Sequence, residues 1–454
     1  MMPMREITFM AAFAVLTVVM LVSALSFLPA NSIVAEKNSE ADLFWSSRRS
    51  DTENTGFNQG PAPDTNQTLW TASVGPKSEG GGGGYVPSAT VGYGKIFVGS
   101  RDGVLHAMDA RTGDAIWNQA LTIGDLFGPA VAHNRVYVVS DANELFAIDE
   151  ETGNVIWTKN IPASPSINVA DDRLFVAAFN GSFYCVNATS GATLWTRDFV
   201  GAGTYIITHP ALAYNRVFLG ALCLNETDGA ILWNMTLSGQ QGIGSRNFPA
   251  VGDGKVFIGI NDTMFCLEAI SGSVIWNYTI GGEVFRAPPA IAYGKLFIPS
   301  TDGFFYCLDV KNGTVLWKKP DVGGIVRIGF GSTSAGAAVA DGKIYLPHPD
   351  WAITCLNATN GEFLWRFLTE GPPAPPIVAG GSIFATLVHD PQIYALGKPA
   401  VTPSPTVQPT AEPTQTPNPT PENNPADFTA ALILGCIVTI VAICALVYYS
   451  KRKG

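Results

Sequence analysis

Histidine and cysteine are the residues best suited to metal binding and nucleophilic catalysis, and this chain of 454 residues has five histidines and seven cysteines. They form no His-x-His, Cys-x-x-Cys or Gly-x-Ser-x-Gly pattern, the short spacings that bring metal ligands or an activated nucleophile together. The sequence therefore predicts no metal ligands and no catalytic residues. Most of the histidines are expected to be ordinary strand and turn residues.

Four polar side chains offer a possible binding site instead. Each lies in a polar segment shortly before an apolar run that opens with Pro or Ala. Guanidinium groups bind carboxylates through two parallel hydrogen bonds, so converging arginines could hold a carboxylate, a sugar acid or a quinone. Solvation of these arginines, or pairing with neighbours such as Glu283, is the alternative interpretation. The four residues are His209, Arg246, Arg286 and Arg327.

The elements that would position these side chains follow from a repeated Gly-x-x-x-Trp motif, as in Gly113–Trp117. Seven copies occur, and Trp70 belongs to an eighth that lacks the glycine. Successive tryptophans are 38 to 48 residues apart, close to the period of a propeller blade. The glycine fits a turn position that needs a positive φ, and the tryptophan is expected to pack on the neighbouring blade. These structural tryptophans are Trp70, Trp117, Trp157, Trp195, Trp233, Trp276, Trp317 and Trp365.

Each repeat holds four short runs of β-branched and aromatic residues separated by three turns, which predicts a four-stranded antiparallel blade. Eight modules begin near residues 86, 129, 165, 210, 249, 289, 337 and 376, and the fourth has an abbreviated middle hairpin. The last module has only three strands, so the segment around Trp70 is expected to complete it and close the ring. The predicted fold is an all-β, eight-bladed β-propeller. Its polar segments connect the outermost strand of one blade to the innermost strand of the next, so the four candidate residues are expected at one mouth of the central channel.

Two motifs between about Trp45 and Gly397 resemble the pyrroloquinoline-quinone-like (PQQ-like) β-propeller repeat family. One is the turn Asp/Asn-x-x-Thr/Ser-Gly-x-x-x-Trp, as in Asp109–Trp117, and the other is the lead-in WSSRRSDTENTG at Trp45–Gly56. The family includes quinoprotein alcohol dehydrogenases and a bacterial outer-membrane assembly lipoprotein. The resemblance implies the fold and leaves the activity open, because one fold hosts many functions.

The resemblance implies that a dehydrogenase of this family holds its quinone on the ring axis between a Trp and a disulfide of adjacent cysteines, with calcium and an Asp base. This chain has no Cys-Cys pair. Five of its cysteines recur at one position of the third strand, roughly 13 Å apart on adjacent blades, which is too far for a disulfide. We therefore expect buried free thiols and no cofactor, with pyrroloquinoline quinone and calcium as the alternative. These cysteines are Cys185, Cys223, Cys266, Cys307 and Cys355.

Two apolar stretches predict contact with a membrane. Residues 7–28 are uncharged and predict a signal peptide or an uncleaved anchor within residues 1–35. Residues 428–449 are long enough to cross a bilayer and precede a basic tail at 451–454, so a transmembrane helix is predicted over 427–450 with a cytosolic C-terminus. The propeller is assigned to residues 36–398 and a Pro/Thr-rich stalk to 399–426. The expected localisation is the cell membrane, with the propeller extracellular.

Charge and sequons restrict the partners. The formal net charge of -10 argues against nucleic acid, because phosphate binding needs a basic surface. Nine Asn-x-Ser/Thr sequons predict glycosylation of an exported chain, although Asn and Thr are also common turn residues. The candidates are Asn66, Asn180, Asn187, Asn225, Asn234, Asn261, Asn277, Asn312 and Asn357.

Three functions are compatible with these observations. The absence of a catalytic constellation favours a non-catalytic cell-surface scaffold that binds a protein, a glycan or an envelope partner. A quinoprotein-type surface dehydrogenase using the arginine-lined mouth is the first alternative. A solute-binding or sensing ectodomain is the second, and it would need a further protein for signalling because the tail has four residues.

Overall fold

The computed structural model describes residues 44–47, 49–75, 89–199, 208–235, 248–282, 288–320, 336–348, 350–388 and 390–399. Contacts divide the chain into two units, Met1–Pro399 and Ala400–Gly454. The predicted N-terminal signal or anchor, residues 400–426 of the predicted stalk, the transmembrane helix and the cytosolic tail lie outside the described residues. Within the described part of the chain, no helix has the length and apolar character needed to cross a membrane.

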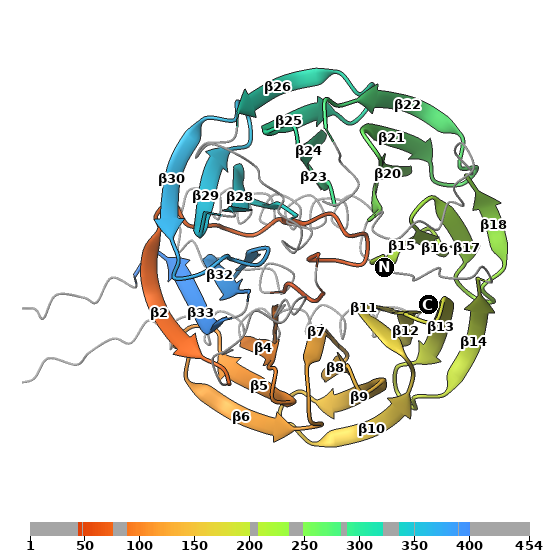
Figure 1. Cartoon of the computed structure of the whole chain (residues 1–454), viewed down its shortest axis with the longest axis vertical. Coiled ribbons are helices and arrows are strands. Elements are labelled where there is room, and N and C mark those ends of the chain that lie inside the picture. The colour runs from red at the N-terminus through yellow and green to blue at the C-terminus, as the bar shows by residue number, and fades with distance from the viewer. Residues whose placement is uncertain are drawn as a thin grey trace, which may run out of the picture. The chain divides into compact units, whose positions relative to one another are not determined.

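The described residues form 33 strands in eight sheets, arranged radially around one axis (Figure 1). This confirms the predicted all-β, eight-bladed propeller. In each blade the strands follow one another in sequence from the innermost to the outermost, except where the two ends of the propeller meet in blade 8. The short hairpin predicted for the fourth module is also confirmed, because only Gly220 and Ala221 separate its second and third strands.

The first four blades each contain four antiparallel strands. Blade 1 consists of β3 (Ala89–Gly92), β4 (Lys95–Gly99), β5 (Val104–Asp109) and β6 (Ala115–Ala120). Blade 2 consists of β7 (Leu126–Ala132), β8 (Arg135–Ser140), β9 (Glu144–Asp149) and β10 (Val155–Asn160). Blade 3 consists of β11 (Ala163–Ala170), β12 (Arg173–Ala178), β13 (Ser182–Asn187) and β14 (Thr193–Asp198). Blade 4 consists of β15 (Ala211–Ala213), β16 (Arg216–Leu219), β17 (Leu222–Asn225) and β18 (Ile231–Asn234).

The other four blades include the closure of the ring. Blade 5 consists of β19 (Ala250–Gly252), β20 (Lys255–Ile260), β21 (Thr263–Glu268) and β22 (Val274–Thr279). Blade 6 consists of β23 (Ala290–Ala292), β24 (Lys295–Pro299), β25 (Phe304–Asp309) and β26 (Val315–Pro320). Blade 7 consists of β27 (Ala338–Ala340), β28 (Lys343–His348), β29 (Ala352–Asn357) and β30 (Phe363–Leu368), with β1 (Phe57–Asn58) added in parallel on the inside. Blade 8 joins β31 (Ile377–Ala379), β32 (Ser382–Leu387) and β33 (Asp390–Gly397) to the N-terminal β2 (Gln67–Ser73), as predicted.

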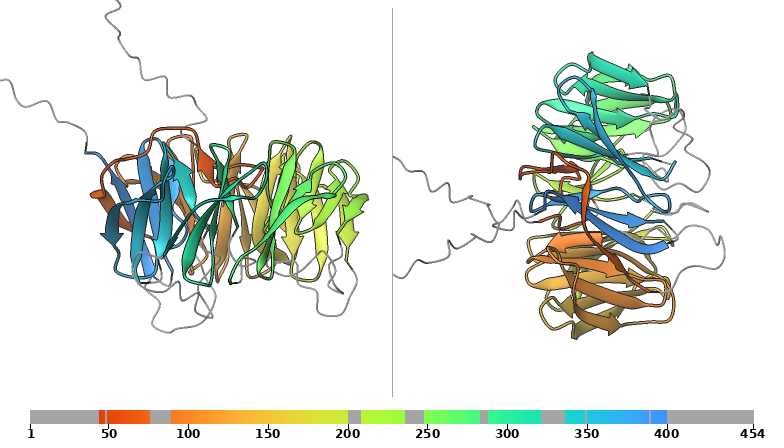
Figure 2. Two further views of the ribbon diagram at one scale, coloured as in Figure 1. Left: turned by 90° about the horizontal axis from the view of Figure 1, so that it is seen from above. Right: turned by 90° about the vertical axis from the view of Figure 1, so that its left-hand side faces the viewer.

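The antiparallel order gives the disc two distinct faces. The lead-in face carries the turns between first and second strands and between third and fourth strands, and the hairpin face carries the turns between second and third strands. The lead-in segment, Phe44–Asn58, and the end of β33 both lie at the lead-in face (Figure 2, left). There Gln67 is paired with Gly397, whose carbonyl oxygen accepts a 2.9 Å hydrogen bond from Thr65 Oγ1.

Neighbouring blades interlock through the Gly-x-x-x-Trp motif. Seven glycines in the turns before the outermost strands have φ between 69° and 78°. A Cβ built on any of them would lie 2.6 to 2.9 Å from an indole atom of the preceding blade's tryptophan, so only glycine fits. The Trp157 Nε1–H also donates to the Ala188 carbonyl of blade 3 at 3.1 Å, and five other blade tryptophans make equivalent bonds. The glycines are Gly113, Gly153, Gly191, Gly229, Gly272, Gly313 and Gly361.

A layer of two aromatic rings around one small side chain forms the middle of each blade. Cys185 of β13 is paired with Phe175 on one side and Trp195 on the other, and the two ring centroids are 6.2 Å apart. Blade 2 has Ala147 in the same place, between Tyr137 and Trp157. Because the rings occupy the space on both sides, this position needs Ala or Cys. The five described cysteines are buried and free, and burial raises the pKa of each thiol to about 12.

The first prediction concerns the packing of tryptophan on glycine. Gly191→Ala is expected to destabilise the propeller by about 3 kcal/mol, because a strained φ of 72° is combined with a Cβ 2.9 Å from Trp157. Gly254→Ala is the matched control: its φ is 71°, and nothing lies within 4 Å of the added Cβ. The control should lose only about 1 kcal/mol. Denaturant unfolding measures both variants, and equal losses would contradict the interlock.

Candidate functional site on the ring axis

The innermost strands of a propeller present a recurrent structural problem. Each has a neighbouring strand on its outer side only, so its inward-facing N–H and C=O groups need other partners. Eight such edges converge on the axis of this ring. The lead-in segment lies across this region, seen as the red and orange trace inside the ring in Figure 1. The axis is therefore the place where one short segment can contact many blades.

The backbone of the lead-in segment is hydrogen bonded to six of the eight innermost strands. Six of its carbonyl oxygens accept N–H donors at N···O distances of 2.7 to 3.0 Å, one from each of blades 1, 2, 4, 5, 6 and 7. Trp45 N–H also donates to the Val91 carbonyl at 2.9 Å, which makes an antiparallel bridge to blade 1. The segment therefore acts as a hub. The donor and acceptor pairs are Val91 to Trp45, Val131 to Ser46, Leu212 to Thr52, Val251 to Glu53, Ile291 to Thr55 and Val339 to Gly56.

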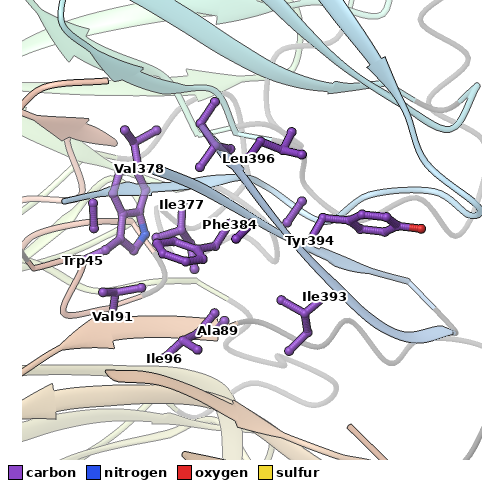
Figure 3. Packing of buried hydrophobic residues seen from close by; sticks show 14 of the residues in the cluster. Trp45, Ala89, Val91, Ile96, Ile377, Val378, Phe384, Ile393, Tyr394 and Leu396 are labelled. Atoms are coloured by element: carbon purple, nitrogen blue, oxygen red, sulfur yellow. The ribbon is translucent and has the colours of Figure 1, made fainter. Parts of the chain in front are cut away.

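Trp45 fixes the beginning of this hub in the hydrophobic core. Its side chain is buried and lies beside Ile377 and Val378 of blade 8 and Val91 of blade 1 (Figure 3). Burying an indole removes a large apolar area from water. Trp45 therefore anchors the hub at the junction where the first and last blades meet.

Arg49 joins blades 6 and 7 from the axis. Its side chain is only 3% exposed, and its guanidinium donates to the Pro289 carbonyl at 3.0 Å and to the Ala337 carbonyl at 3.1 Å. Two glycines make room for it: a Cβ on Gly336 would lie 2.0 Å from Nη1, and one on Gly56 would lie 2.5 Å from Nη2. The side chain is therefore enclosed by backbone on several sides.

Two asparagine side chains join blades 3 to 5 by donating hydrogen bonds to backbone carbonyl oxygens. Asn54 is buried, and its Nδ2 lies 3.1 to 3.2 Å from the carbonyl oxygens of His209, Pro210 and Pro249. Asn168 of β11 donates from Nδ2 to the Thr52 carbonyl at 2.9 Å and to the Pro210 carbonyl at 3.0 Å. An amide nitrogen has two protons, so it can bridge neighbouring carbonyls. These two side chains add further hydrogen bonds between the blades to those made by the backbone of the hub.

Two carboxylates give the hub its electrostatic character. Asp51 accepts hydrogen bonds from the Thr55 N–H at 2.9 Å and from the Thr55 hydroxyl, yet desolvation raises the pKa of Asp51 above its usual value. The pKa of half-buried Glu53 is also raised, first by desolvation and then by the negative charges of Asp51 and Asp253. Deprotonation of these two carboxyl groups therefore destabilises the folded state.

The side chains that lie on the ring axis determine whether a quinone or a metal ion could bind there. At the lead-in end, the described residues place the chain's own Arg49 and Asn54 side chains on the carbonyls of the residues directly before four innermost strands. A quinone held on the axis there would have to displace these groups, so the described residues do not fit that cofactor at this end. Within the described ranges, no group of three or more His, Cys, Asp and Glu side chains is placed to hold a metal ion.

Comparison with models of known protein families identifies the family to which the chain belongs. The sequence model of the outer membrane protein assembly factor BamB matches residues 60–169, 152–221 and 220–402, which together cover most of the chain. The chain belongs to the BamB family. This membership agrees with the resemblance of the Gly-x-x-x-Trp turns and the lead-in to PQQ-like propellers.

Solved structures share the fold of this BamB-family chain at low sequence identity. BamB from Moraxella catarrhalis is 16% identical with a TM-score of 0.57, over 74% of this chain and 100% of that one. The quinohemoprotein alcohol dehydrogenase ADHIIG from Pseudomonas putida HK5 is 12% identical with a TM-score of 0.58, over 87% and 86% of the two chains. The computationally designed Ika8 protein is 13% identical with a TM-score of 0.57, over 68% and 95%. No curated protein matches the chain.

The predicted channel-mouth residues are only partly described. Arg246, Arg286 and Arg327 lie outside the described residues. His209 is buried two residues before β15, where its ring stacks on Phe248 with centroids 5.1 Å apart and an interplanar angle of 24°. Convergence of the three arginines with His209 stays a prediction.

The nine sequons fall into two structural groups. Four asparagines are half-buried. In two of these the Nδ2 atom, to which a glycan would be attached, is already a hydrogen-bond donor: Asn66 Nδ2 donates to the Arg366 carbonyl at 2.8 Å, and Asn187 Nδ2 donates to Asp172 at 3.2 Å. The other two of this group are Asn225 and Asn357, which accept turn N–H groups. The exposed group is Asn180, Asn234, Asn261, Asn277 and Asn312. Glycosylation itself stays a prediction.

Sequence reasoning singled out the lead-in as a motif but missed the roles of Arg49 and Asn54 on the axis. A signal was available. The eight innermost strands of a closed ring need partners for their inner edges, and the lead-in is a segment rich in Ser, Thr, Asn and Arg that precedes the first blade. What the sequence lacks is any periodicity that would assign each lead-in residue to a blade.

The second prediction tests Arg49. Arg49→Met is expected to destabilise the propeller by about 2 to 4 kcal/mol, because two buried carbonyls lose their charged donor. Arg111→Met, at an exposed turn position of blade 1, is the control and should change stability by less than about 0.5 kcal/mol. Urea unfolding of the two variants measures the difference, and an Arg49 variant as stable as the control would refute the hub.

The third prediction concerns pH. The pKa of Glu53 is raised in the folded state, so the stability it contributes is fully present below its unfolded pKa and is lost as pH rises through the folded pKa. Glu53→Gln should therefore raise Tm at about pH 7, and the gain should vanish at about pH 4. Asp253→Asn removes one neighbouring charge and should give a smaller gain in the same direction. Parallel Tm curves for wild type and Glu53→Gln would contradict the assignment.

Proposed function

We propose that this BamB-family chain is a non-catalytic scaffold of the cell surface, anchored by its C-terminal apolar stretch and binding a protein partner in the envelope. The propeller is a rigid platform in this function, and its faces bind the partner. Glycan recognition is a second form of the same scaffold function.

The observation that carries this proposal is the hub on the ring axis. In a quinoprotein of this fold, as the family resemblance implies, the axis holds the reactive group. Here Arg49, Asn54 and the lead-in backbone occupy the lead-in end of the axis and are hydrogen bonded to the innermost strands of six blades. Those contacts tie blades together, which is a structural task.

Family membership supports the same function. The matching family is described as an outer membrane protein assembly factor, and one relative of the same fold is BamB itself. Assembly factors work by contact with other proteins. The similarity to a quinohemoprotein alcohol dehydrogenase keeps the oxidoreductase as the alternative function, because that relative has the same fold at comparable identity.

The placement at the cell surface is part of the proposal. It rests on the uncharged stretch at residues 7–28, the stretch at 428–449 with its basic tail, and the sequons. The five buried thiols without a disulfide suit an exported protein in a reducing or anaerobic habitat.

The fourth prediction separates scaffold from oxidoreductase. Titration of the purified full chain with pyrroloquinoline quinone and calcium should leave the quinone absorbance and the Tm unchanged. Saturable binding would raise stability by about 2.7 kcal/mol at a hundredfold excess over Kd, and would overturn the scaffold proposal. A variant with Arg246, Arg286 and Arg327 all replaced by Gln is the control, because loss of binding in it would place a quinone at the predicted channel mouth.

A further inference from the structure

The two faces of the propeller differ in what surrounds them. Both ends of the described propeller lie at the lead-in face: the lead-in segment begins there, and β33 ends there beside the start of β2. The hairpin face carries the turns between second and third strands and has neither of these chain ends. A partner can therefore approach the hairpin face without meeting either end of the described propeller.

One turn on the hairpin face departs from its equivalents. In five blades the last turn residue donates its N–H to the carbonyl three residues earlier and has a positive φ. Four blades use Gly or Asn there, which tolerate this conformation. Blade 7 uses Trp351, with φ 67° and 52% of its side chain exposed. The five residues are Gly103, Asn143, Gly181, Gly303 and Trp351.

Trp351 has no folding advantage over the residues that replace it elsewhere in the ring. A bulky side chain at positive φ costs conformational energy, and exposing an indole to water gives up the gain from burying it. Strain of this kind persists where function requires the residue. Trp is also among the residue types enriched in the hot spots at the centres of protein interfaces.

A second apolar side chain adjoins this tryptophan. Leu368, the last residue of β30, is 71% exposed and is paired with Ala352, the residue after Trp351. The next residue, Thr369, donates its N–H to the Trp351 carbonyl at 2.7 Å. Trp351 and Leu368 are therefore two exposed apolar residues that lie close together along the backbone at the hairpin face of blade 7.

The ring continues from blade 7 through blade 8 to blades 1 and 2, and this sector is acidic on the hairpin face. The loop between blades 1 and 2 adds Ile123, which is 98% exposed. The described turns and loops of the sector contain five carboxylates and one arginine, Arg101, which lies 3.8 Å from Asp125. Arg366 of β30 forms an ion pair with Asp350. Among the described residues the sector is net negative even when both arginines and Lys159, near the end of β10, are counted. The carboxylates are Asp102, Asp125, Asp141, Asp350 and Glu370.

The exposed sequons avoid this sector. Blades 3, 4, 5 and 6 carry all five exposed sequon asparagines, whereas blades 1 and 2 carry no sequon at all. The sequons at Asn66 in the segment before β2 and at Asn357 in blade 7 are half-buried. A glycan is bulky and keeps other proteins away from the surface around it. The exposed sequons therefore lie outside the half of the ring that carries Trp351, Leu368 and Ile123.

We propose that the hairpin face of blades 7, 8, 1 and 2 is the docking sector for a partner protein, which presents an apolar pocket surrounded by Lys and Arg. Trp351 and Leu368 fill the pocket, and the acidic turns attract the basic surroundings. Charge complementarity and the absence of exposed sequons select a basic protein surface over a second copy of this acidic chain. This inference rests on the proposed scaffold function and assigns its binding surface.

The fifth prediction uses photo-crosslinking of the full chain in the cells that make it. A benzophenone amino acid at Ile123, in the sector, should give one discrete adduct, and one at Ile270, an exposed turn of blade 5 at the lead-in face, should not. Trp351→Gly should reduce the adduct at position 123 at least about fivefold. This substitution also relieves the positive φ, so it should not lower Tm.

A glycan placed in the sector gives an independent test. The pair D102N/V104S turns Asp102-Gly103-Val104 of blade 1 into the Asn-Gly-Ser that Asn180-Gly181-Ser182 form in the equivalent turn of blade 3. The added glycan should abolish the adduct, and Asn180→Gln, which removes the exposed sequon of blade 3, should leave it intact. Mass spectrometry of the variant tells whether the sequon is modified.

The outcomes are distinguishable. A full adduct in Trp351→Gly, an adduct from position 270 that equals that from position 123, or an adduct made of two copies of this chain would overturn the docking sector. Salt at about 0.5 M screens attraction between charged surfaces. An adduct that persists in about 0.5 M NaCl and joins an acidic partner peptide would therefore overturn the proposed attraction between the acidic turns and a basic partner surface. A D102N/V104S chain without sugar would count against the extracellular scaffold, while the Trp351→Gly result would still test the sector.

Discussion

The structure depends on how a closed ring satisfies the inner edges of its blades. Six of the eight innermost blade strands have only three or four residues, and apart from β27, which pairs with β1, they have a strand neighbour only on the outer side. Water could satisfy these groups, but independent solvation would leave the blades free to shift against one another. The lead-in segment instead binds six blades through one continuous backbone, and Arg49 and Asn54 extend these contacts. The axis thus holds the ring together in addition to the contacts between adjacent blades.

The contacts between adjacent blades are built from one repeated unit. In seven of the eight blades the tryptophan of the outermost strand packs on a turn glycine of the next blade. In the middle of its own blade each tryptophan packs against a small residue and a second aromatic ring. The residue before each tryptophan is unpaired because the register shifts there, as at Ile156 and Leu232. Such bulges interrupt the exposed outer edge, so the rim of the disc is a poor template for pairing with another sheet.

Much of this architecture could be predicted from the sequence because it repeats. Seven copies of Gly-x-x-x-Trp fixed the period, and the unpaired segment at Trp70 predicted the strand that closes blade 8. The hub could not be assigned in this way, since Arg49 and Asn54 occur once and their partners are backbone carbonyls, which no side-chain pattern reveals. The fifth strand of blade 7 was also missed, because β1 has two residues and pairs in parallel. Trp351 was not singled out from the sequence, because its exposure and its positive φ depend on the conformation of the turn and not on its residue type.

The closure of blade 8 has a consequence for synthesis. Its outermost strand, β2, is made before any complete blade, and its partner β33 is the last strand of the propeller to be made. Throughout translation of the propeller, β2 therefore waits for a partner strand that does not yet exist, and the lead-in hub gains its partners one blade at a time. The ring can close only when the chain has been synthesised as far as Gly397, so a nascent propeller must be protected from wrong pairings for nearly the whole of its synthesis.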